Sequence, residues 1–284
     1  MALKDLREYI ALLEGKGQLA RIAAEVDPML EIGEITDRVS KAGGPGLLFE
    51  HPVDRATGRR YGLPVAINLM GSYDRMAWAL GVDATTGTWR DLDAKGRQLM
   101  DLLPLDMPSG MRGKFDALIG LKDIAGAGPK EVKSSKAPVQ EVVLRGDDVD
   151  LGILPVLTTW PGDGGPFITL PLVFTRHPDT GARNMGMYRL QVFDKRTTGM
   201  HWHAHKGGAQ HYRVAEEMGV DLPVAVALGP DPACTYAATA PMPDDMDEYL
   251  LAGYVRKRPV ELVKCVTNDL HVPANSQMVI EGFV

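Results

Sequence analysis

The sequence predicts an α+β protein in which a small N-terminal α/β domain precedes a larger, β-rich domain. Over residues 1–110, apolar residues at helical spacing alternate with short apolar runs. Over residues 139–284, short β-type runs are separated by turn residues, which indicates a barrel or a sandwich. Between them, residues 111–138 are rich in Pro, Gly, Lys and Ser and show little periodicity, as expected of a connector.

The N-terminal domain should contain helices and buried strands in alternation. Leu6, Ile10 and Leu13 recur at helical spacing and are followed by glycines, so we expect a first helix over residues 3–14. Asp-Pro and Gly-Gly-Pro sequences delimit the second helix. The further helices are expected at residues 27–39 and 72–80, and strands at residues 19–22, 47–49 and 65–69.

The second domain should consist mainly of short strands. We expect these at residues 140–144, 146–151, 168–174, 185–193, 200–204, 224–228, 261–266 and 278–284. A single helix is expected over Asp245–Val255, because Met246, Tyr249, Leu250 and Tyr254 form an apolar side there.

Residues 184–212 gather most of the side chains that carry chemistry, including four of the seven histidines. Residues 185–193 favour a strand, 194–199 a turn and 200–204 a returning strand, which predicts a β-hairpin. Since side chains alternate along a strand, His201, His203 and His205 should share one face. Three imidazoles on one face suggest a metal ion, an anion or both.

Such a histidine run can also be solvated and inert on an exposed strand. Its neighbours argue for a ligand, because Asn184 and Arg189 lie on the preceding strand and Lys206-Gly207-Gly208 follows the last histidine. A Lys-Gly-Gly turn offers a cation and unobstructed backbone N–H groups, which suit a phosphate. We therefore expect a phosphate-bearing ligand held by a hard metal ion and basic side chains.

A carboxylate should complete such a metal site, since an amide oxygen and an imidazole leave a divalent cation undercharged. Asp244, Asp245, Asp247 and Glu248 cluster where the last helix should begin. Acidic residues there also favour the helix dipole, so the cluster alone does not select a ligand.

Composition excludes several partners. The net charge is −6 without basic blocks, so neither nucleic acid nor an anionic membrane surface is indicated. We find no apolar segment long enough to span a membrane, and MALKDLREYI lacks a signal-peptide core. Cys234 and Cys265 lie apart in apolar contexts, as expected of reduced core thiols in a cytoplasmic protein.

The chain resembles the UbiD-type aromatic acid decarboxylases, which use prenylated FMN. The resemblance extends over essentially the whole chain and is closest to the 4-hydroxy-3-polyprenylbenzoate decarboxylases of ubiquinone biosynthesis. It rests on blocks in the same order: DLREYIALLEGKGQLARI, EIGEITDRVSKAGGPGLLFE, GDDVDLGILPVLTTWPGDGG, NMGMYRLQVFD, VAVALGPDPA, DEYLLAGYVR and VELVKCVTNDLHVPA.

The resemblance implies that residues 139–284 form a flavin-binding split β-barrel. In relatives, a segment with the acid–base carboxyl groups, a further α/β domain and oligomerising helices come after the part that this chain matches. We therefore expect an N-terminal portion of a longer enzyme, a homo-oligomer in its full-length form, whose proton donor lies beyond Val284. Ending inside the apolar run 278–284 should leave an unpaired strand edge.

The resemblance also implies roles for individual residues. The metal-binding positions fall on Asn184, His205 and Glu248, which would hold a divalent ion, usually manganese, that bridges to the flavin phosphate; potassium is also typical. The flavin-contacting positions fall on Met187, Tyr188, Arg189, His201, Trp202, His203, Lys206 and Gly207. A flavin prenyltransferase would supply the cofactor.

Arg189 is the candidate catalytic residue. It could simply form a salt bridge on its strand, but the family role is to engage the substrate carboxylate beside the flavin. The implied reaction is the non-oxidative decarboxylation of an aromatic, 4-hydroxybenzoate-type acid, which could carry a polyprenyl chain.

Two other functions stay open from the sequence. One is a non-catalytic flavin- or phosphate-binding fragment, or a subunit that needs a second chain for the proton donor. The other is an FMN-dependent oxidoreductase, which the Asn184, His205 and Glu248 set and the lack of a G-x-G-x-x-G fingerprint disfavour. We expect His211 to be an ordinary surface or core histidine.

Overall fold

The computed structural model describes residues 3–82, 90, 93–94, 96–97, 126–240 and 247–284. Within them the chain is a mixed α/β protein with several sheets. Most of the predicted connector lies outside the described residues. Asp244 and Asp245 of the acidic cluster, and Met246 of the expected helix, also lie outside them. The division into domains at residues 110 and 138 stays a prediction.

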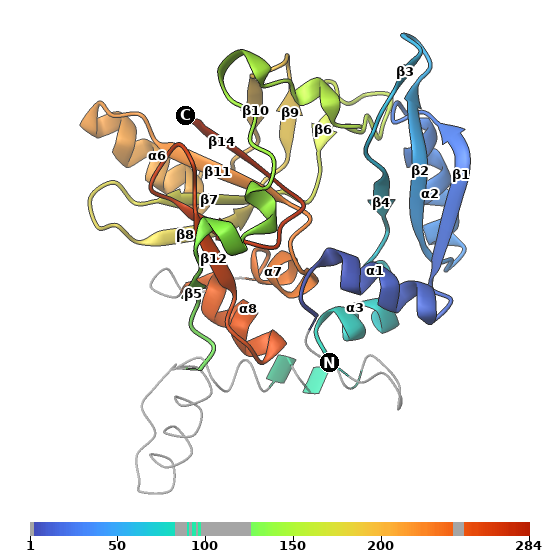
Figure 1. Ribbon diagram of the computed structural model, residues 1–284, viewed down its shortest axis with the longest axis horizontal. Helices are drawn as coiled ribbons and strands as arrows, with labels where there is room; N and C mark the ends of the chain where they lie inside the picture. The colour runs from blue at the N-terminus through green and yellow to red at the C-terminus, as the bar shows by residue number, and fades with distance from the viewer. Residues whose placement is uncertain (1–2, 83–89, 91–92, 95, 98–125, 241–246) are drawn as a thin grey trace, which may run out of the picture.

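The N-terminal elements form a βαβ unit with helices beside it (Figure 1). Strands β1 and β2 are parallel, and β3 and β4 pair antiparallel with β2. The predicted helices and strands of this region are confirmed, with shifted ends; Asp5 caps the first helix by accepting the Glu8 N–H at 2.9 Å. The elements are α1 (Leu6–Gly15), β1 (Leu19–Val26), α2 (Glu31–Lys41), β2 (Gly46–Asp54), β3 (Arg59–Arg60), β4 (Val65–Ile67) and α3 (Tyr73–Ala79).

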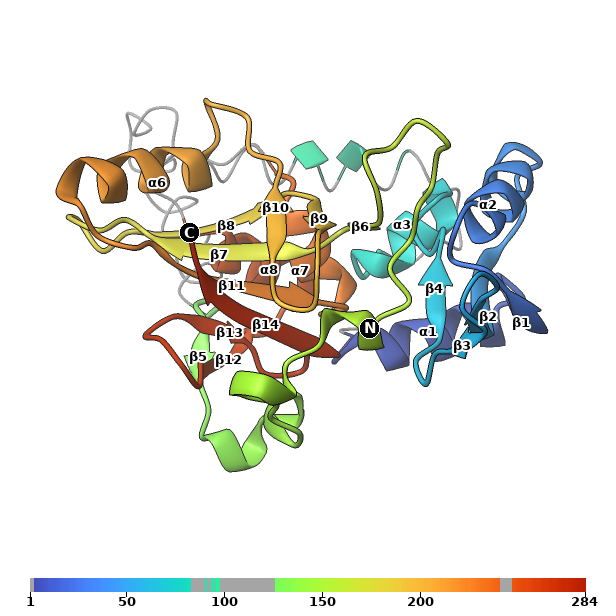
Figure 2. The same ribbon diagram turned by 90° about the horizontal axis from the view of Figure 1, so that it is seen from above.

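The remaining strands form three sheets. An antiparallel sheet has the order β14-β11-β7-β8, and two smaller sheets have the orders β10-β9-β6 and β13-β12-β5 (Figures 1 and 2). Whether they close into the expected split barrel stays a prediction. The strands are β5 (Lys130–Glu131), β6 (Phe167–Ile168), β7 (Leu172–Arg176), β8 (Arg183–Met187), β9 (Leu190–Val192), β10 (Thr198–Met200), β11 (Pro223–Leu228), β12 (Glu261–Lys264), β13 (His271–Pro273) and β14 (Met278–Phe283).

Several sequence predictions for this region were wrong. Residues 140–144 and 146–151 contain no strand; short 3-10 turns stand at 138–140, 146–148 and 151–153, where Pro138, Gly146 and the Asp150 cap favour turns. Besides the expected helix, α8 (Glu248–Arg256), the chain forms α6 (Gly207–Met218) and α7 (Pro232–Ala237). Helix α6 opens on two glycines, which we interpreted as a turn.

The predicted hairpin is only partly correct. Its first strand divides into β8 and β9, which belong to different sheets, and β9 pairs with β10 across a turn at residues 193–197. Strand β10 ends at Met200, and the Trp202 N–H turns back to the Met200 carbonyl at 3.2 Å. The three histidines therefore do not share a strand face: they lie on the segment that leads from β10 into α6.

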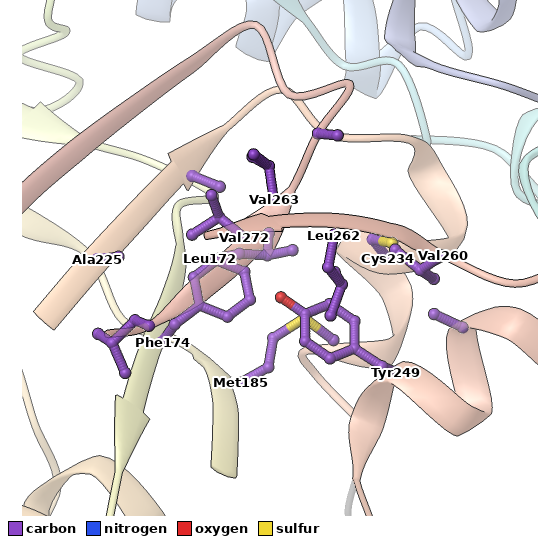
Figure 3. Close-up of a cluster of buried hydrophobic side chains, with 14 of the residues drawn as sticks. Leu172, Phe174, Met185, Ala225, Cys234, Tyr249, Val260, Leu262, Val263 and Val272 are labelled. Carbon is purple, nitrogen blue, oxygen red and sulfur yellow. The ribbon is translucent and has the colours of Figure 1, made fainter. Parts of the chain in front are cut away.

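The core lies on both faces of the sheet β14-β11-β7-β8. Side chains alternate along β7, so Leu172 and Phe174 face one side and Val173 and Thr175 the other. The first side packs against α7, α8, β12 and β13 (Figure 3), where Phe174 stacks on Tyr249 with ring centroids 5.8 Å apart. The second side packs against β6, β9 and the Tyr188 ring. Cys234 and Cys265 are free and buried in the first cluster, as predicted.

Strand β8 is the outer strand of its sheet, and both α6 and α8 contact it. Helix α6 lies alongside β7 and β8 (Figure 2), on the side of Thr175, whereas α8 packs on the side of Phe174. The opposite outer strand of this sheet is β14. Over the residues that the structure describes, no helix is long and apolar enough to cross a membrane.

The close packing of α8 predicts that replacing Gly253 by alanine destabilises the protein, although alanine favours helices. A Cβ at Gly253 would lie 2.0 Å from the Ala127 carbonyl oxygen, a backbone atom that cannot swing aside. Although Ala is the better helix former, Gly253→Ala should lower the free energy of unfolding by about 1–3 kcal/mol. Urea unfolding followed by circular dichroism measures this.

The matched control is Gly15→Ala, at the last residue of α1, where a Cβ would meet no atom within 4 Å. It should be neutral or stabilise the chain by less than about 1 kcal/mol. A Gly253→Ala protein as stable as the Gly15→Ala protein would contradict the close contact between α8 and Ala127.

Candidate functional site

Asn184 on β8 lies against the start of α6. A Cβ added to Gly207 would come within 2.2 Å of the Asn184 side-chain oxygen, so only glycine fits there without moving the amide. The Asn184 Nδ2 atom is 3.5 Å from the Tyr188 hydroxyl, and the Gly208 N–H points to the same hydroxyl at 3.4 Å. The structure thus brings Asn184, Tyr188 and the Gly-Gly pair together.

Glu248, the first residue of α8, reaches the same strand from the other side. Its Oε2 atom accepts the Met185 N–H at 3.1 Å. Because β8 is an edge strand, this N–H points away from the sheet and has no strand to receive it. The carboxyl group therefore lies beside the residue that follows Asn184 in the chain.

The environment of Glu248 disfavours its ionised form. Burial raises the pKa of this carboxyl from 4.5 to about 7, opposed by backbone hydrogen bonds and the nearby Arg183. Arg183 forms its ion pair with Asp247 instead. No ion pair to Glu248 is formed by the described residues, so a bound cation would stabilise its carboxylate.

His205 and Lys206 precede α6 and are exposed. The His205 ring lies beside that of His203, with centroids 5.8 Å apart. The His201 ring is instead nearly perpendicular to the Phe167 ring, with centroids 4.9 Å apart. His205 makes no hydrogen bond to Asn184 or Glu248. Within the described part of the chain, no group of three or more His, Cys, Asp or Glu residues could hold a metal; an Asn-His-Glu set contains only two of these.

The beginning of α6 is suited to an anion. Lys206 stands at the N-cap position without a side-chain cap. Of the first backbone N–H groups of this helix of 12 residues, that of Gly208 points to Tyr188, and the N-cap side chain leaves the others uncapped. The helix dipole favours negative charge at that end. The Lys-Gly-Gly sequence, which we expected to form a turn, is thus the start of a helix. It still offers a cation and backbone N–H groups that suit a phosphate.

Arg189 lies in a second group of side chains. Its guanidinium is 4.1 Å from the centre of the Phe167 ring, and its Nη1 atom is 3.5 Å from the Asp163 carboxylate. The Arg189 carbonyl accepts the His201 N–H at 3.1 Å. The charged end of Arg189 is therefore held between an aromatic face and a carboxylate, with about half of the side chain exposed.

Tyr188 and Trp202 pack against each other beside Gly208. Tyr188 is buried, and the Trp202 ring meets it edge-on with centroids 6.3 Å apart. The Trp202 Nε1 atom is buried and has no hydrogen-bond partner in the structure. Met187 points to the opposite side of β8, where it packs against the cluster of Phe174 and Tyr249. Of the predicted flavin contacts, Met187 thus has its side chain in the cluster on this face, whereas Tyr188 and Trp202 belong to the cluster on the other face.

Sequence reasoning missed the partners of these residues. Asp163 and Phe167 belong to the segment PGDGGPF, to which we assigned no role. The backbone at the start of this loop is tied to the N-terminal elements, because the Leu30 N–H donates to the Thr158 carbonyl at 2.8 Å. The acidic residue in a Gly-rich loop was the available signal for Asp163.

Family models match most of the chain. Residues 130–284 match the 3-octaprenyl-4-hydroxybenzoate carboxy-lyase Rift-related domain, and residues 10–92 match the corresponding N-terminal domain. The chain belongs to the UbiD family. An uncharacterized protein of Archaeoglobus fulgidus is 46% identical to this UbiD chain over 288 residues, which cover 100% of this chain and 55% of the relative.

Solved UbiD-class structures share the fold. A dimeric form of the enzyme HmfF from Pelotomaculum thermopropionicum in complex with prFMN has a TM-score of 0.81 and 32% identity, over 99% of this chain and 57% of that one. The vanillic acid decarboxylase of Sedimentibacter hydroxybenzoicus in its closed form has a TM-score of 0.84 and 30% identity, over 100% of this chain and 55% of that chain. The chain thus spans about half the length of the relatives that it matches.

The raised pKa of Glu248 predicts a pH dependence of stability in the metal-free protein. Since the pKa is above its unfolded value of 4.5, this group favours folding fully below pH 4.5, and the contribution is lost as the pH rises to about 7. The change amounts to about 3 kcal/mol at most. Glu248→Gln removes the titration and keeps an acceptor for Met185.

We therefore expect the melting temperature of the Gln variant, relative to wild type, to increase between pH 5 and pH 8 in the presence of a chelator. Differential scanning calorimetry measures both proteins. A constant difference across this range would show that the Glu248 carboxyl is not held in its neutral form by burial.

Proposed function

We propose that this chain binds prenylated FMN and a divalent metal ion, manganese by preference, and serves the non-oxidative decarboxylation of an aromatic acid. The observation that carries this proposal is the meeting of three features on β8: the Asn184 amide, the glycine-rich start of α6 and the partly buried Glu248 carboxyl. Membership in the UbiD family supports it, because relatives of known structure bind prFMN.

The residues present fit both groups. A metal ion would offset the charge of the partly buried Glu248, which no ion pair of the described residues does. A phosphate would accept the uncapped N–H groups at the start of α6, and the unpartnered Trp202 Nε1 donor is available to an acceptor on the flavin. Gly207 and Gly208 let the start of α6 lie directly against these groups, since a Cβ on either would meet Asn184 or the Tyr188 and Trp202 rings.

The metal would be held by Asn184, His205 and Glu248. His205 is exposed and stands two residues before Gly207, at the end of a segment without regular structure, so its ring can turn toward an ion bound at Asn184. The flavin would contact Met187, Tyr188, Arg189, His201, Trp202, His203, Lys206 and Gly207; potassium is a further proposed ligand. For Met187 we propose backbone contact, because its side chain lies in the core.

Arg189 would bind the substrate carboxylate. The guanidinium stacks on Phe167 and keeps donors free, because its single contact with Asp163 is a long one, at 3.5 Å. Prenylated FMN, when bound, would accept the electron pair of the bond between the ring carbon and the carboxylate as carbon dioxide leaves. We propose a phenolic benzoate as substrate, by analogy with the vanillic acid and 3,4-dihydroxybenzoic acid decarboxylases among the similar structures.

The metal assignment makes a sharp prediction for Glu248→Gln. Because the ion would join the protein to the flavin phosphate, the variant should lose manganese and flavin together, each by at least about tenfold in affinity. Metal analysis and the visible spectrum of the purified protein measure this; the spectrum also separates modified from ordinary flavin.

Asp247→Asn is the matched control. It removes the neighbouring charge and keeps the cap on the Tyr249 N–H, to which the Asp247 side chain accepts at 2.9 Å. This variant should retain metal and flavin. Full manganese content in Glu248→Gln would refute the ligand role.

The proposed role of Arg189 predicts that its removal weakens binding only of ligands that carry a carboxylate. Arg189→Ala should retain flavin but bind 4-hydroxybenzoate at least about tenfold more weakly, whereas methyl 4-hydroxybenzoate, which lacks the charge, should bind both proteins alike. Flavin fluorescence measures binding. In protein that turns over, exchange of labelled carbon dioxide into the acid should also cease.

Arg196→Ala tests whether the loss of any arginine has this effect. Arg196 lies in the turn between β9 and β10 and pairs with the exposed Asp147. Its removal should leave acid binding unchanged. Equal weakening of the acid and the ester by Arg189→Ala would argue against a carboxylate contact.

A further inference from the structure

His211 is a buried histidine with one close partner. Its Nδ1 atom is 2.8 Å from the Thr175 hydroxyl oxygen, and both residues are buried, at 7% and 1% exposure. The sequence offered no role for it beyond an ordinary histidine. Its place in the fold connects it with the candidate site.

His211 lies on the face of α6 that is turned toward the sheet. Residues three and four apart share a helix face, so His211 is on the side of Gly207 and Gly208. A Cβ on Gly207 would meet the Asn184 amide, and one on Gly208 would lie 3.1 Å from the Tyr188 ring. The same face of the first turn thus contacts Asn184, Tyr188 and, through His211, Thr175.

Thr175 and Asn184 are directly opposite each other on β7 and β8. Directly opposite residues of an antiparallel pair point to the same face of the sheet. The hydroxyl that holds His211 and the amide proposed to bind the metal therefore both face α6.

The other buried residues of α6 have small side chains. They are Gly208, Ala209 and Ala215, which permit close approach to the sheet and carry no polar side-chain group that could orient the helix. The partly buried Tyr212 adds a ring contact with Trp202, with centroids 5.7 Å apart. The hydrogen bond between His211 and Thr175 is directional, and leaving either buried group unpaired would lower the stability of the fold. It therefore orients this part of α6 against β7.

The imidazole is neutral at physiological pH. Burial, with a smaller effect of the nearby His177, lowers the pKa of His211 to about 4. The His177 ring meets it edge-on with centroids 5.2 Å apart. A neutral ring keeps the contact with Thr175 intact over the range in which manganese and flavin would bind.

We propose that Thr175 and His211 are positioning residues, whose hydrogen bond sets the first turn of α6 and so holds His205, Lys206 and Gly207 in register with Asn184. The proposal concerns the placement of α6. It rests on the proposed function only in taking manganese and flavin as the ligands that bind beside this helix.

The experiment removes the hydrogen bond without changing the shape of the side chain. Thr175→Val replaces the hydroxyl by a methyl group, and Thr175→Ser retains the hydroxyl. Dissociation constants for manganese, from electron paramagnetic resonance, and for FMN, from fluorescence, should rise at least about tenfold in the Val variant and stay within about twofold in the Ser variant. His211→Leu should raise the dissociation constants as much as Thr175→Val does. His211→Asn, which places an amide near the Nδ1 position, should recover most of the affinity.

Two comparisons separate positioning from a general loss of stability. Thr235→Val removes another buried threonine hydroxyl, which contacts the Asp231 carbonyl at 3.4 Å, and should not change the dissociation constants. The double variant Thr175→Val/His211→Leu should bind no worse than either single variant, since both remove one interaction.

A ligand-free measurement tests the placement independently. The Gln210 N–H donates to the Lys206 carbonyl at 3.0 Å in the first turn of α6. Its hydrogen exchange should be at least about tenfold faster in Thr175→Val, with a smaller change at residues 215–218. If wild type binds neither manganese nor FMN but this difference is found, the proposed function fails and the positioning pair stands. Unchanged exchange at Gln210 in Thr175→Val overturns the positioning pair.

Discussion

The contact on which the candidate site depends is the hydrogen bond from the Met185 N–H to Glu248. It joins an unpaired edge of the main sheet to the first residue of α8 and so holds the start of that helix beside β8. On the other side of the same strand, the start of α6 lies against Asn184 because Gly207 and Gly208 have no side chains. Strand β8 is therefore a common support for elements that are far apart in the chain.

Local patterns predicted the elements whose signals lie within one segment. Leu6, Ile10 and Leu13 sufficed for α1, and the apolar run at residues 47–49 sufficed for the first part of β2. Helix α6 escaped prediction because Gly-Gly at its start favours a turn by propensity, whereas packing against β8 requires those glycines. The Asp231-Pro232 start of α7 was a recognisable cap signal that we did not use.

The candidate residues of the site could be named from the sequence because they stand in segments that resemble a known family. Their contacts could not, since these depend on which strands become neighbours. Thr175 meets His211 only after β7, β8 and α6 have assembled, and Asp163 meets Arg189 beside the pairing of β6 with β9. The strand face proposed for the three histidines was wrong because the returning strand ends at Met200, where the chain turns before α6 begins at Gly207.

The proposed metal site would connect cation loading with the lifetime of the protein. A carboxyl that burial keeps from ionising weakens the fold once it loses its proton, and a cation bound at Glu248 would reverse that effect by mass action. Unloaded molecules would then open more often at neutral pH and be cleaved sooner by cellular proteases. On this proposal, scarcity of manganese would lower the amount of the protein as well as the occupancy of its site.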